Sequence, residues 1–440
     1  MSDDEEFGGL LLPKSSKDCF RGIQSCSQPW QIVDANVQRG ARNYRIQGAL
    51  LVEKQYLLAE QTIDEQDLYD LIAWLKTNPW LTQGDLVRMF EKRWAEWIGL
   101  RYATFVNSGS SANLLMYYAL LLSGNLRNKK VVVPAVSWAT TVAPAIQLGF
   151  EPIMCEADWD DFGLDLNYLE TLLKKHNPGA VIIVHVLGAP NEMASLLELK
   201  DRFGFVLMED ACAATASRYD DQLVGTFGEV STFSFFYGHH LSTLEGGIVC
   251  TNDDKLHDIL VQIRSHGWPK DLVPEKEVAH ARKYDVIEFN RPFTFYYPGF
   301  NVRSTDLNAR IGLSQMDKID YVVKRRIENH EIYQSRFLDA PDFHCQRNER
   351  ATICSISFVA LAQSLAHRDG IARHLKAKRI ETRPLGGGNM SRQPFWAERY
   401  ETTVFPVADR IHNTAFQLPN HPLLSPEDVN YICDTVFSVR

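Results

Sequence analysis

The sequence has no long uninterrupted run of apolar residues, so we expect no transmembrane helix, which needs about 18 or more of them. Positive charge is in deficit: 46 Lys and Arg against 55 Asp and Glu give a net charge of −9, which argues against nonspecific nucleic-acid binding. Residues 1–6 are acidic where a secretion signal carries positive charge before an apolar run. We therefore expect a cytoplasmic protein.

Closely spaced cysteine pairs are also missing. The eight cysteines form no Cys-x-x-Cys motif, and none lies between Cys250 and Cys345. This spacing predicts reduced, mostly buried thiols and no disulfide framework. It also argues against an iron–sulfur cluster, which needs clustered cysteine ligands. His239 and His240 do not suggest a metal site, because adjacent side chains diverge and no carboxylate–cysteine set accompanies them.

What is present is the composition of an ordinary soluble protein, with 45% hydrophobic and 23% charged residues. A chain of 440 residues is long enough for two or three domains and a sizeable core. Residues 1–60 show mixed polarity and little periodicity, and we interpret them as an N-terminal extension. We predict a large domain over 61–322 and a smaller one over 323–440.

The large domain is predicted to be α/β, because short β-rich runs alternate with helical stretches. The runs cover 103–107, 130–134, 152–155, 180–184, 205–209 and two parts of 231–251. This alternation indicates a mostly parallel central sheet with helices on both faces, which binds ligands at the C-terminal ends of its strands.

The pattern changes after about residue 320. We predict a long helix over 324–337, a strand over 352–359, a helix over 369–378 and a last helix opened by Ser425-Pro-Glu-Asp. These elements predict a smaller C-terminal α/β domain.

The segment 231–250 organises the chain. It predicts an apolar strand, a turn with two histidines, and a Glu245-Gly-Gly that opens a second strand. It resembles the cofactor-lysine segment of the DegT/DnrJ/EryC1/StrS sugar aminotransferases, pyridoxal-phosphate enzymes of fold type I, in which Ser-Phe, three residues, Lys-Asn and Glu-Gly-Gly follow in order. Here His239 occupies the lysine position, a departure shared with the family's 3-dehydratases of 4-keto nucleotide sugars. The resemblance runs from near residue 62 almost to the end.

Two segments resemble sites where the family holds its cofactor. Gly109, Ser110 and Ser111 lie in a small-residue turn that follows a strand and opens a helix; small residues let an anion approach the backbone, and helix-start amides supply donors. The resemblance places the cofactor phosphate there. Asp210 ends an apolar strand and matches the carboxylate that keeps the cofactor's pyridine nitrogen protonated. Three residues later the family usually has Gln, His or Glu, but this chain has Ala213.

Three further residues carry over from the family. Trp138 follows a strand at the position that stacks on the cofactor ring, with a core tryptophan as the alternative. Ser234 matches a serine that contacts the phosphate. Asn301, in Gly-Phe-Asn-Val-Arg, matches an asparagine that reaches the partner's cofactor phosphate, so the resemblance implies a homodimer with composite sites.

Substrate-binding candidates lie in two later segments. Glu381 and Arg383 belong to a Glu-x-Arg-Pro pattern that the 3-dehydratases also show. Arg383 can form a bidentate contact with the carboxylate of glutamate, the family's amino donor, and Glu381 can bind sugar hydroxyls; an interdomain salt bridge is the alternative. Arg264 lies in a segment that resembles a loop near the substrate, and a surface helix end is its alternative.

These residues lead to a functional hypothesis. Histidine has no primary amine, so the cofactor is expected to sit noncovalently as pyridoxal or pyridoxamine phosphate, with His239 transferring protons. The resemblance then implies a dehydratase that removes the C3 hydroxyl of a 4-keto nucleotide sugar, is recharged by glutamate and needs no iron–sulfur reductase. The alternatives are an aminotransferase with an untethered cofactor and an inactive relative kept as a binding or regulatory protein.

Overall fold

A computed structural model describes residues 54–401 and 403–439, and most of the predicted N-terminal extension lies outside this range. The described residues are organised around a seven-stranded sheet with the order β1-β9-β8-β5-β4-β2-β3. All its strands run parallel except β9, which is antiparallel to both neighbours. The strands are β1 (Tyr102–Val106), β2 (Lys130–Pro134), β3 (Glu151–Cys155), β4 (Ala180–Val184), β5 (Val206–Asp210), β8 (Val230–Ser234) and β9 (Gly247–Thr251).

Helices cover both faces of this sheet, as the alternation of β-rich and helical segments predicts. Side chains alternate along each strand, so Val131 and Val133 belong to one hydrophobic core and Val132 to another. The first core contains α3 (Gly109–Ser123), α4 (Ala139–Gln147) and α7 (Asp254–Ile263). The opposite face packs against α2 (Asp85–Ile98), α5 (Leu166–His176), α6 (Met193–Phe203) and α9 (Asp306–Met316).

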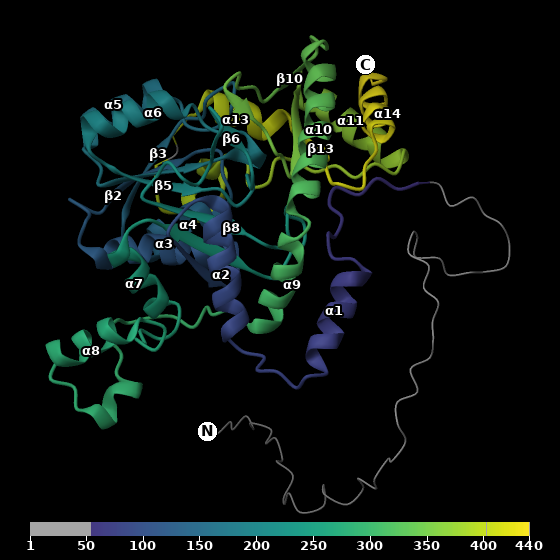
Figure 1. The fold of residues 1–440 in the computed structure, drawn as a ribbon. Helices are drawn as coiled ribbons and strands as arrows, with labels where there is room; N and C mark the ends of the chain where they lie inside the picture. Colours follow the sequence, from purple (N-terminus) through teal and green to yellow (C-terminus); the bar gives the residue numbers. More distant parts are fainter. Residues whose placement is uncertain (1–53, 402, 440) are drawn as a thin grey trace, which may run out of the picture. The chain divides into compact units, whose positions relative to one another are not determined.

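The C-terminal part is a smaller α/β layer around an antiparallel three-stranded sheet. Its strands β10 (Phe343–Cys345), β12 (Ser357–Ala362) and β13 (Ala415–Pro419) share a core with α10 (Ile319–Leu338), α11 (Leu365–Ala377) and α14 (Pro426–Phe437). Ser425 caps α14 in a capping box, with Pro426 in the first turn. Figure 1 shows α10 as the long helix beside this layer.

The remaining elements are shorter or peripheral. They are α1 (Glu65–Leu75), η1 (Val186–Gly188), β6 (Arg218–Tyr219), β7 (Gln222–Leu223), α8 (Pro274–Lys283), η2 (Glu288–Phe293), β11 (Ala351–Thr352), η3 (Met390–Arg392), α12 (Pro394–Ala397) and α13 (Pro406–Thr414). Figure 1 shows α8 in a lobe that stands out from the sheet. Of the described helices, none is long and apolar enough to cross a bilayer.

One predicted strand, 352–359, is interrupted in the structure. Cys354 donates its backbone N–H to the Ser217 hydroxyl at 3.0 Å, and Ile356 donates its own to the Leu187 carbonyl at 3.2 Å. Because of these long-range bonds, the backbone between β11 and β12 does not pair with a neighbouring strand. The predicted helix 369–378 begins earlier, at Leu365, because the Ser364 hydroxyl caps it by accepting from the His367 amide.

Candidate active site

The small-residue turn lies between β1 and α3. Ser108 caps α3: its hydroxyl accepts from the Ser111 amide at 3.0 Å. The Ser110 side chain is exposed, with its hydroxyl 3.1 Å from that of Thr140 on α4. The N-terminus of a 15-residue helix favours negative charge, so this turn offers an anion the dipole and the Ser110 hydroxyl. The Ser111 amide is already used by the cap, and phosphate binding by Ser111 stays a prediction.

Glycine is needed around this turn because three chain segments meet there. A Cβ on Gly109 would lie 2.7 Å from the Ser234 Cβ and 3.1 Å from the Cys212 sulfur. A Cβ on Gly247 would collide with the Ser108 carbonyl. The Glu-Gly-Gly motif therefore has a steric cause: its second glycine lets β9 begin directly against the turn. Ser234, at the end of β8, is thus beside Gly109.

Asp210 ends β5 and is held by three hydrogen bonds. Its side chain is 3% exposed. Oδ2 accepts from Asn113 Nδ2 at 2.8 Å and from Thr141 Oγ1 at 2.7 Å, and Oδ1 accepts from the Cys212 amide at 3.1 Å. These bonds fix one orientation of the carboxylate at the C-terminal edge of the sheet.

Sequence reasoning missed Asn113 and Thr141. Asn113 lies on α3 and Thr141 on α4, and both are buried. Asn113 also accepts a 2.6 Å bond from Thr232 Oγ1 on β8. The available signal was a single asparagine on the buried side of an otherwise apolar helix, because a buried amide needs partners.

His239 lies in the turn after β8, and its ring is oriented by a backbone carbonyl. Nδ1 is 2.6 Å from the Cys212 oxygen. Since a carbonyl can only accept, Nδ1 carries the proton and the neutral ring keeps its lone pair on Nε2. Burial lowers the pKa of His239 to about 4; the Arg326 and Arg383 charges act in the same direction, whereas the Cys212 carbonyl and Asp210 oppose them. The imidazole is therefore neutral at pH 7 and can act as a base through Nε2.

His240 points to a different part of the structure. It is fully buried, and its Nε2 lies 2.7 Å from the Cys354 carbonyl in the C-terminal part of the chain. Burial lowers its pKa as well. The two adjacent histidines thus contact separate carbonyls, and only His239 contacts the Cys212 backbone that follows Asp210.

The exposed indole of Trp138 lies beside the C-terminal segment 381–389. Trp138 is the N-cap of α4 and is 58% exposed. A Cβ on Gly386 would lie 3.3 Å from the indole Cζ3, and Met390 donates its backbone N–H to Ala135 at 2.7 Å. The alternative of a core tryptophan is wrong, because the indole is more than half exposed. Stacking on a cofactor ring stays a prediction.

Glu381 and Arg383 are both exposed, but their bonds differ. The Glu381 carboxylate accepts from the Leu58 amide at 2.8 Å, so it partly serves to hold the segment before α1. Arg383 Nε donates to Gln417 Oε1 at 3.4 Å, and the guanidinium is near enough to help lower the pKa of His239. The Arg383 charge thus acts on His239, and substrate binding by Glu381 and Arg383 stays a prediction.

Arg264 differs from its prediction as a residue near the substrate. It is 1% exposed and its guanidinium contacts protein groups alone: Glu91, the Phe105 carbonyl at 2.9 Å and Asp271 at 3.4 Å. The two carboxylates compensate its buried charge, and the Phe105 bond secures β1. The alternative of a surface helix end is also wrong, because the side chain is buried, and both guanidinium Nη atoms already donate to protein groups rather than to a substrate.

Asn301 is exposed close to the end of β1. Its Oδ1 accepts from Arg303 Nε at 3.1 Å, and the neighbouring Val302 carbonyl accepts from the Asn107 amide at 2.9 Å. The segment thus borders the small-residue turn, while the Asn301 amide group keeps hydrogen-bonding capacity toward solvent.

His185 has a structural place. Its Nε2 lies 3.2 Å from a Glu209 oxygen and its Nδ1 accepts from the Asn191 amide at 3.3 Å, all in the interior. In the described part of the chain, no cluster of His, Cys, Asp and Glu suits a metal ion.

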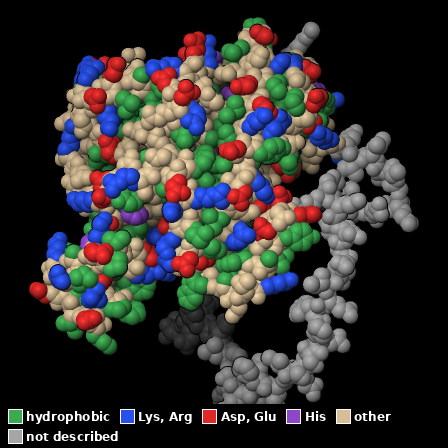
Figure 2. All heavy atoms as spheres, in the orientation of Figure 1, with side chains coloured by type: hydrophobic (Ala, Val, Ile, Leu, Met, Phe, Trp, Pro, Cys, Tyr) green, Lys and Arg blue, Asp and Glu red, His purple; other side chains and the backbone are tan. Residues whose placement is uncertain are grey.

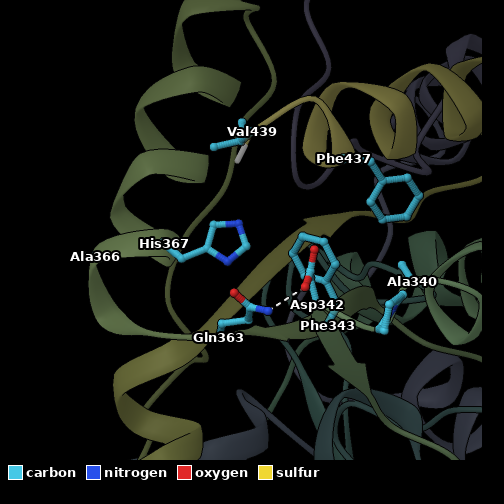
Figure 3. Close-up of a pocket in the computed structure, with 9 residues that line it drawn as sticks. Ala340, Asp342, Phe343, Gln363, Ala366, His367, Phe437 and Val439 are labelled. Atoms are coloured by element: carbon cyan, nitrogen blue, oxygen red, sulfur yellow. Dashed lines mark hydrogen bonds between the residues drawn. The ribbon is translucent and has the colours of Figure 1, made fainter.

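A separate hollow of about 700 Å³ lies in the C-terminal part (Figure 3). Phe343 and Phe437 supply apolar walls, and Gln363 donates to Asp342 at 2.5 Å. None of the predicted site residues lines it. The hollow is therefore distinct from the site around His239.

Comparison with protein families matches residues 61–437 to the DegT/DnrJ/EryC1/StrS aminotransferase family. The chain belongs to this family. The match covers most of the chain and confirms the predicted resemblance. Similarity to a solved structure of the family with bound pyridoxal phosphate confirms the predicted fold.

Several members of the family are similar over nearly their whole length. The GDP-4-keto-6-deoxy-D-mannose 3-dehydratase of Escherichia coli O55:H7 is 30% identical over 86% of this chain and 98% of its own length. The GDP-perosamine synthase of Escherichia coli O157:H7 is 30% identical over 82% of this chain and 92% of its own. A crystal structure of GDP-4-keto-6-deoxymannose-3-dehydratase with a trapped PLP–glutamate geminal diamine has 28% identity and a TM-score of 0.79, covering 87% of this chain and 100% of that one.

The residues of this site fit pyridoxal phosphate. Asp210 presents a fixed carboxylate for a pyridine nitrogen, and the start of α3 suits a phosphate. Trp138, which lies between these two segments in the sequence, exposes its indole ring. His239 lies in the turn after β8, at the position that the family motif assigns to lysine.

Proposed function

We propose that this protein is a 3-dehydratase of a 4-keto-6-deoxy nucleotide sugar in deoxysugar or O-antigen biosynthesis. It uses noncovalently held pyridoxal or pyridoxamine phosphate, which glutamate recharges, and the nucleotide that the relatives favour is GDP. One observation carries the proposal: His239 occupies the lysine position with its Nδ1 fixed on the Cys212 carbonyl. Such a residue can move protons but cannot tether the cofactor.

When bound, the cofactor supplies an amine for the 4-keto group and a ring that accepts the electrons released at its methylene carbon. Asp210 holds the proton on the ring nitrogen. His239 Nε2 takes a proton from that methylene carbon and then delivers it to the departing C3 hydroxyl. Arg383 binds the glutamate carboxylate during recharging. Over a full cycle, nucleotide sugar and glutamate give 3-deoxy-4-keto sugar, 2-oxoglutarate and ammonia.

An aminotransferase is the second candidate, because a GDP-perosamine synthase is as similar as the dehydratase at 30% identity. The two reactions leave different products. A transaminase keeps the nitrogen on the sugar, whereas the dehydratase removes one oxygen and releases ammonia. His239 favours the second outcome, since no lysine amine is present in the turn to displace the sugar from the cofactor.

The test is incubation of the protein with pyridoxal phosphate, glutamate and a panel of GDP-, CDP-, UDP- and dTDP-linked 4-keto-6-deoxy sugars, followed by mass spectrometry. We expect one sugar to lose a single oxygen atom, with equal amounts of ammonia and 2-oxoglutarate, in the presence of an iron chelator and without a reductase. An amino sugar as the product would support the aminotransferase. No turnover, and no visible cofactor band that glutamate bleaches, would indicate an inactive relative.

We also propose a homodimer. The lobe that carries α8 and η2 exposes large apolar side chains, including Phe289 at 90%, Phe293 at 72% and Ile287 at 63% exposure. Hydrophobic side chains are visible on this lobe in Figure 2. Several large apolar side chains exposed on one lobe are consistent with an interface between subunits. Asn301 lies shortly after the lobe in sequence, with its amide exposed.

Replacing Asn301 by Ala should weaken cofactor retention while the fold stays intact, because in a composite site the amide donates to the partner's cofactor phosphate. The loss of one such charge-assisted bond corresponds to roughly 1.5–3 kcal/mol of binding free energy. The measurement is the cofactor Kd by absorbance titration, with far-UV circular dichroism and the mass in solution as controls. A wild-type monomer that binds cofactor at full strength would contradict the composite site.

A further inference from the structure

Arg326, on α10, is a buried cation that the proposed mechanism does not yet use. It is 1% exposed, its four hydrogen bonds all go to main-chain carbonyls, and its Nε has no partner. Within the described residues it forms no ion pair, in contrast to Arg264, which has two carboxylates. Burial lowers the pKa of Arg326 only to about 10, so it remains charged at neutral pH.

The guanidinium joins the His239 turn to two segments of the C-terminal part. Nη2 donates to the His239 carbonyl at 3.3 Å. Nη1 donates to the Ile356 carbonyl at 3.1 Å, just before β12, and to the Asn420 carbonyl after β13. The Asn420 amide in turn donates to the Arg326 and Ser355 carbonyls at 3.1 Å. A planar group with several fixed donors is suited to holding such separate acceptors in one geometry.

Four charged or titratable groups act on the His239 imidazole or adjoin it. Arg326 on α10 and Arg383 before β13 disfavour its protonated form, Asp210 on β5 favours it, and His240 follows in the same turn. Arg383 is exposed and screened by solvent, whereas Arg326 is buried and has no counter-ion. The field of Arg326 is therefore the more persistent of the two.

We propose that Arg326 is a positioning residue for His239: its guanidinium fixes the main chain of the turn, and its charge, which no carboxylate neutralises, adds to burial in disfavouring protonation of the imidazole. This rests on the proposed function only in taking His239 as the proton carrier. A weakly basic imidazole, once protonated, is a strong acid, which suits delivery of the proton to a poor hydroxyl leaving group. The buried cation thus favours the second half of the proton transfer, in which the leaving hydroxyl is protonated.

The charge is tested by NMR titration of the apo protein with ¹³C-labelled histidine, the His239 signal being assigned by its loss in His239→Asn. We expect Arg326→Gln to raise the His239 midpoint by about one pH unit and Arg326→Lys, which keeps the charge, to leave it nearly unchanged. Arg325→Gln is the matched control: Arg325 is the adjacent residue of α10, but it pairs with Glu328 and donates to Leu424 at 2.7 Å. An unshifted midpoint in Arg326→Gln would overturn the proposal.

The fixed geometry is tested by Arg326→Lys in the complete reaction. A lysine keeps the charge but cannot hold the separate carbonyls, so kcat should fall about tenfold or more with KM little changed. Wild-type kcat in that variant would refute the positioning role. If Arg326→Gln does not fold, the rate of Arg326→Lys decides the positioning role, and a wild-type midpoint near the ordinary 6.5 would overturn the electrostatic role. The titration needs neither cofactor nor sugar, so it stands even if the protein dehydrates no sugar.

Discussion

Replacing His239 by Asn is expected to lower dehydration by roughly 10²–10⁴-fold, the usual contribution of a single positioned acid–base group. Asparagine has no titratable nitrogen, so the proton has no carrier between the cofactor methylene carbon and the C3 hydroxyl. Cofactor binding should persist, because Asp210, Ser110 and Trp138 are unchanged. The measurement is the initial rate of deoxysugar formation beside an absorbance titration with pyridoxal phosphate.

The control for this variant is His240→Asn. His240 donates to the Cys354 carbonyl in the interior, so its loss should cost about 1–3 kcal/mol of unfolding free energy and change the rate far less. The pH dependence of the dehydration rate gives a second check on the role of His239. Because burial lowers the pKa of His239 to about 4, the base form is present above that pH and is lost as the pH falls through it. Full dehydratase activity in His239→Asn would refute the proposed mechanism.

Replacing His239 by Lys is expected to convert a protein with no covalently held cofactor into one that borohydride links to it permanently. The surroundings of a tethering lysine are retained: Ser234 ends the preceding strand, and Gly247 opens the next one against Ser108. A primary amine in this turn can react with the pyridoxal aldehyde, whereas imidazole cannot. Intact mass after borohydride treatment should show one cofactor per chain in the variant and none in the wild type.

The same variant should dehydrate more slowly, because a lysine favours retention of the amine on the sugar and holds the cofactor in its tethered form. Treatment without borohydride is the control, since the unreduced adduct hydrolyses. A reducible adduct in the native protein would exclude untethered cofactor and, with it, the role assigned to His239.

The fold could largely be predicted from the sequence because its determinants are local. Apolar runs such as 130–134 and 180–184 became β2 and β4 with the predicted bounds, since strand burial is encoded in neighbouring residues. The predicted strand 352–359 is interrupted because its backbone bonds to Ser217 and Leu187, more than a hundred residues away in sequence. No periodicity carries that information.

Candidate site residues that lie within a sequence motif could be predicted. Residues that contact them from distant segments of the chain could not. Asp210 and His239 lie in recognisable motifs, but Asn113 is 97 residues from Asp210, and Arg326 is 87 residues from His239. Arg264 shows the opposite failure. Its segment resembles a substrate loop, yet the carboxylates of Glu91 and Asp271 draw its side chain into the interior.

The close packing of Gly247 against Ser108 has a consequence for how catalysts of this kind diversify. The backbone fit around Gly109 depends on glycines and on strand register, and none of these contacts involves the side chain at position 239. Under the proposed mechanism, replacement of this one residue would therefore alter the fate of the substrate while the surrounding backbone stays unchanged. Libraries that seek new sugar chemistry should hold Gly109 and Gly247 constant and randomise the residues that face His239.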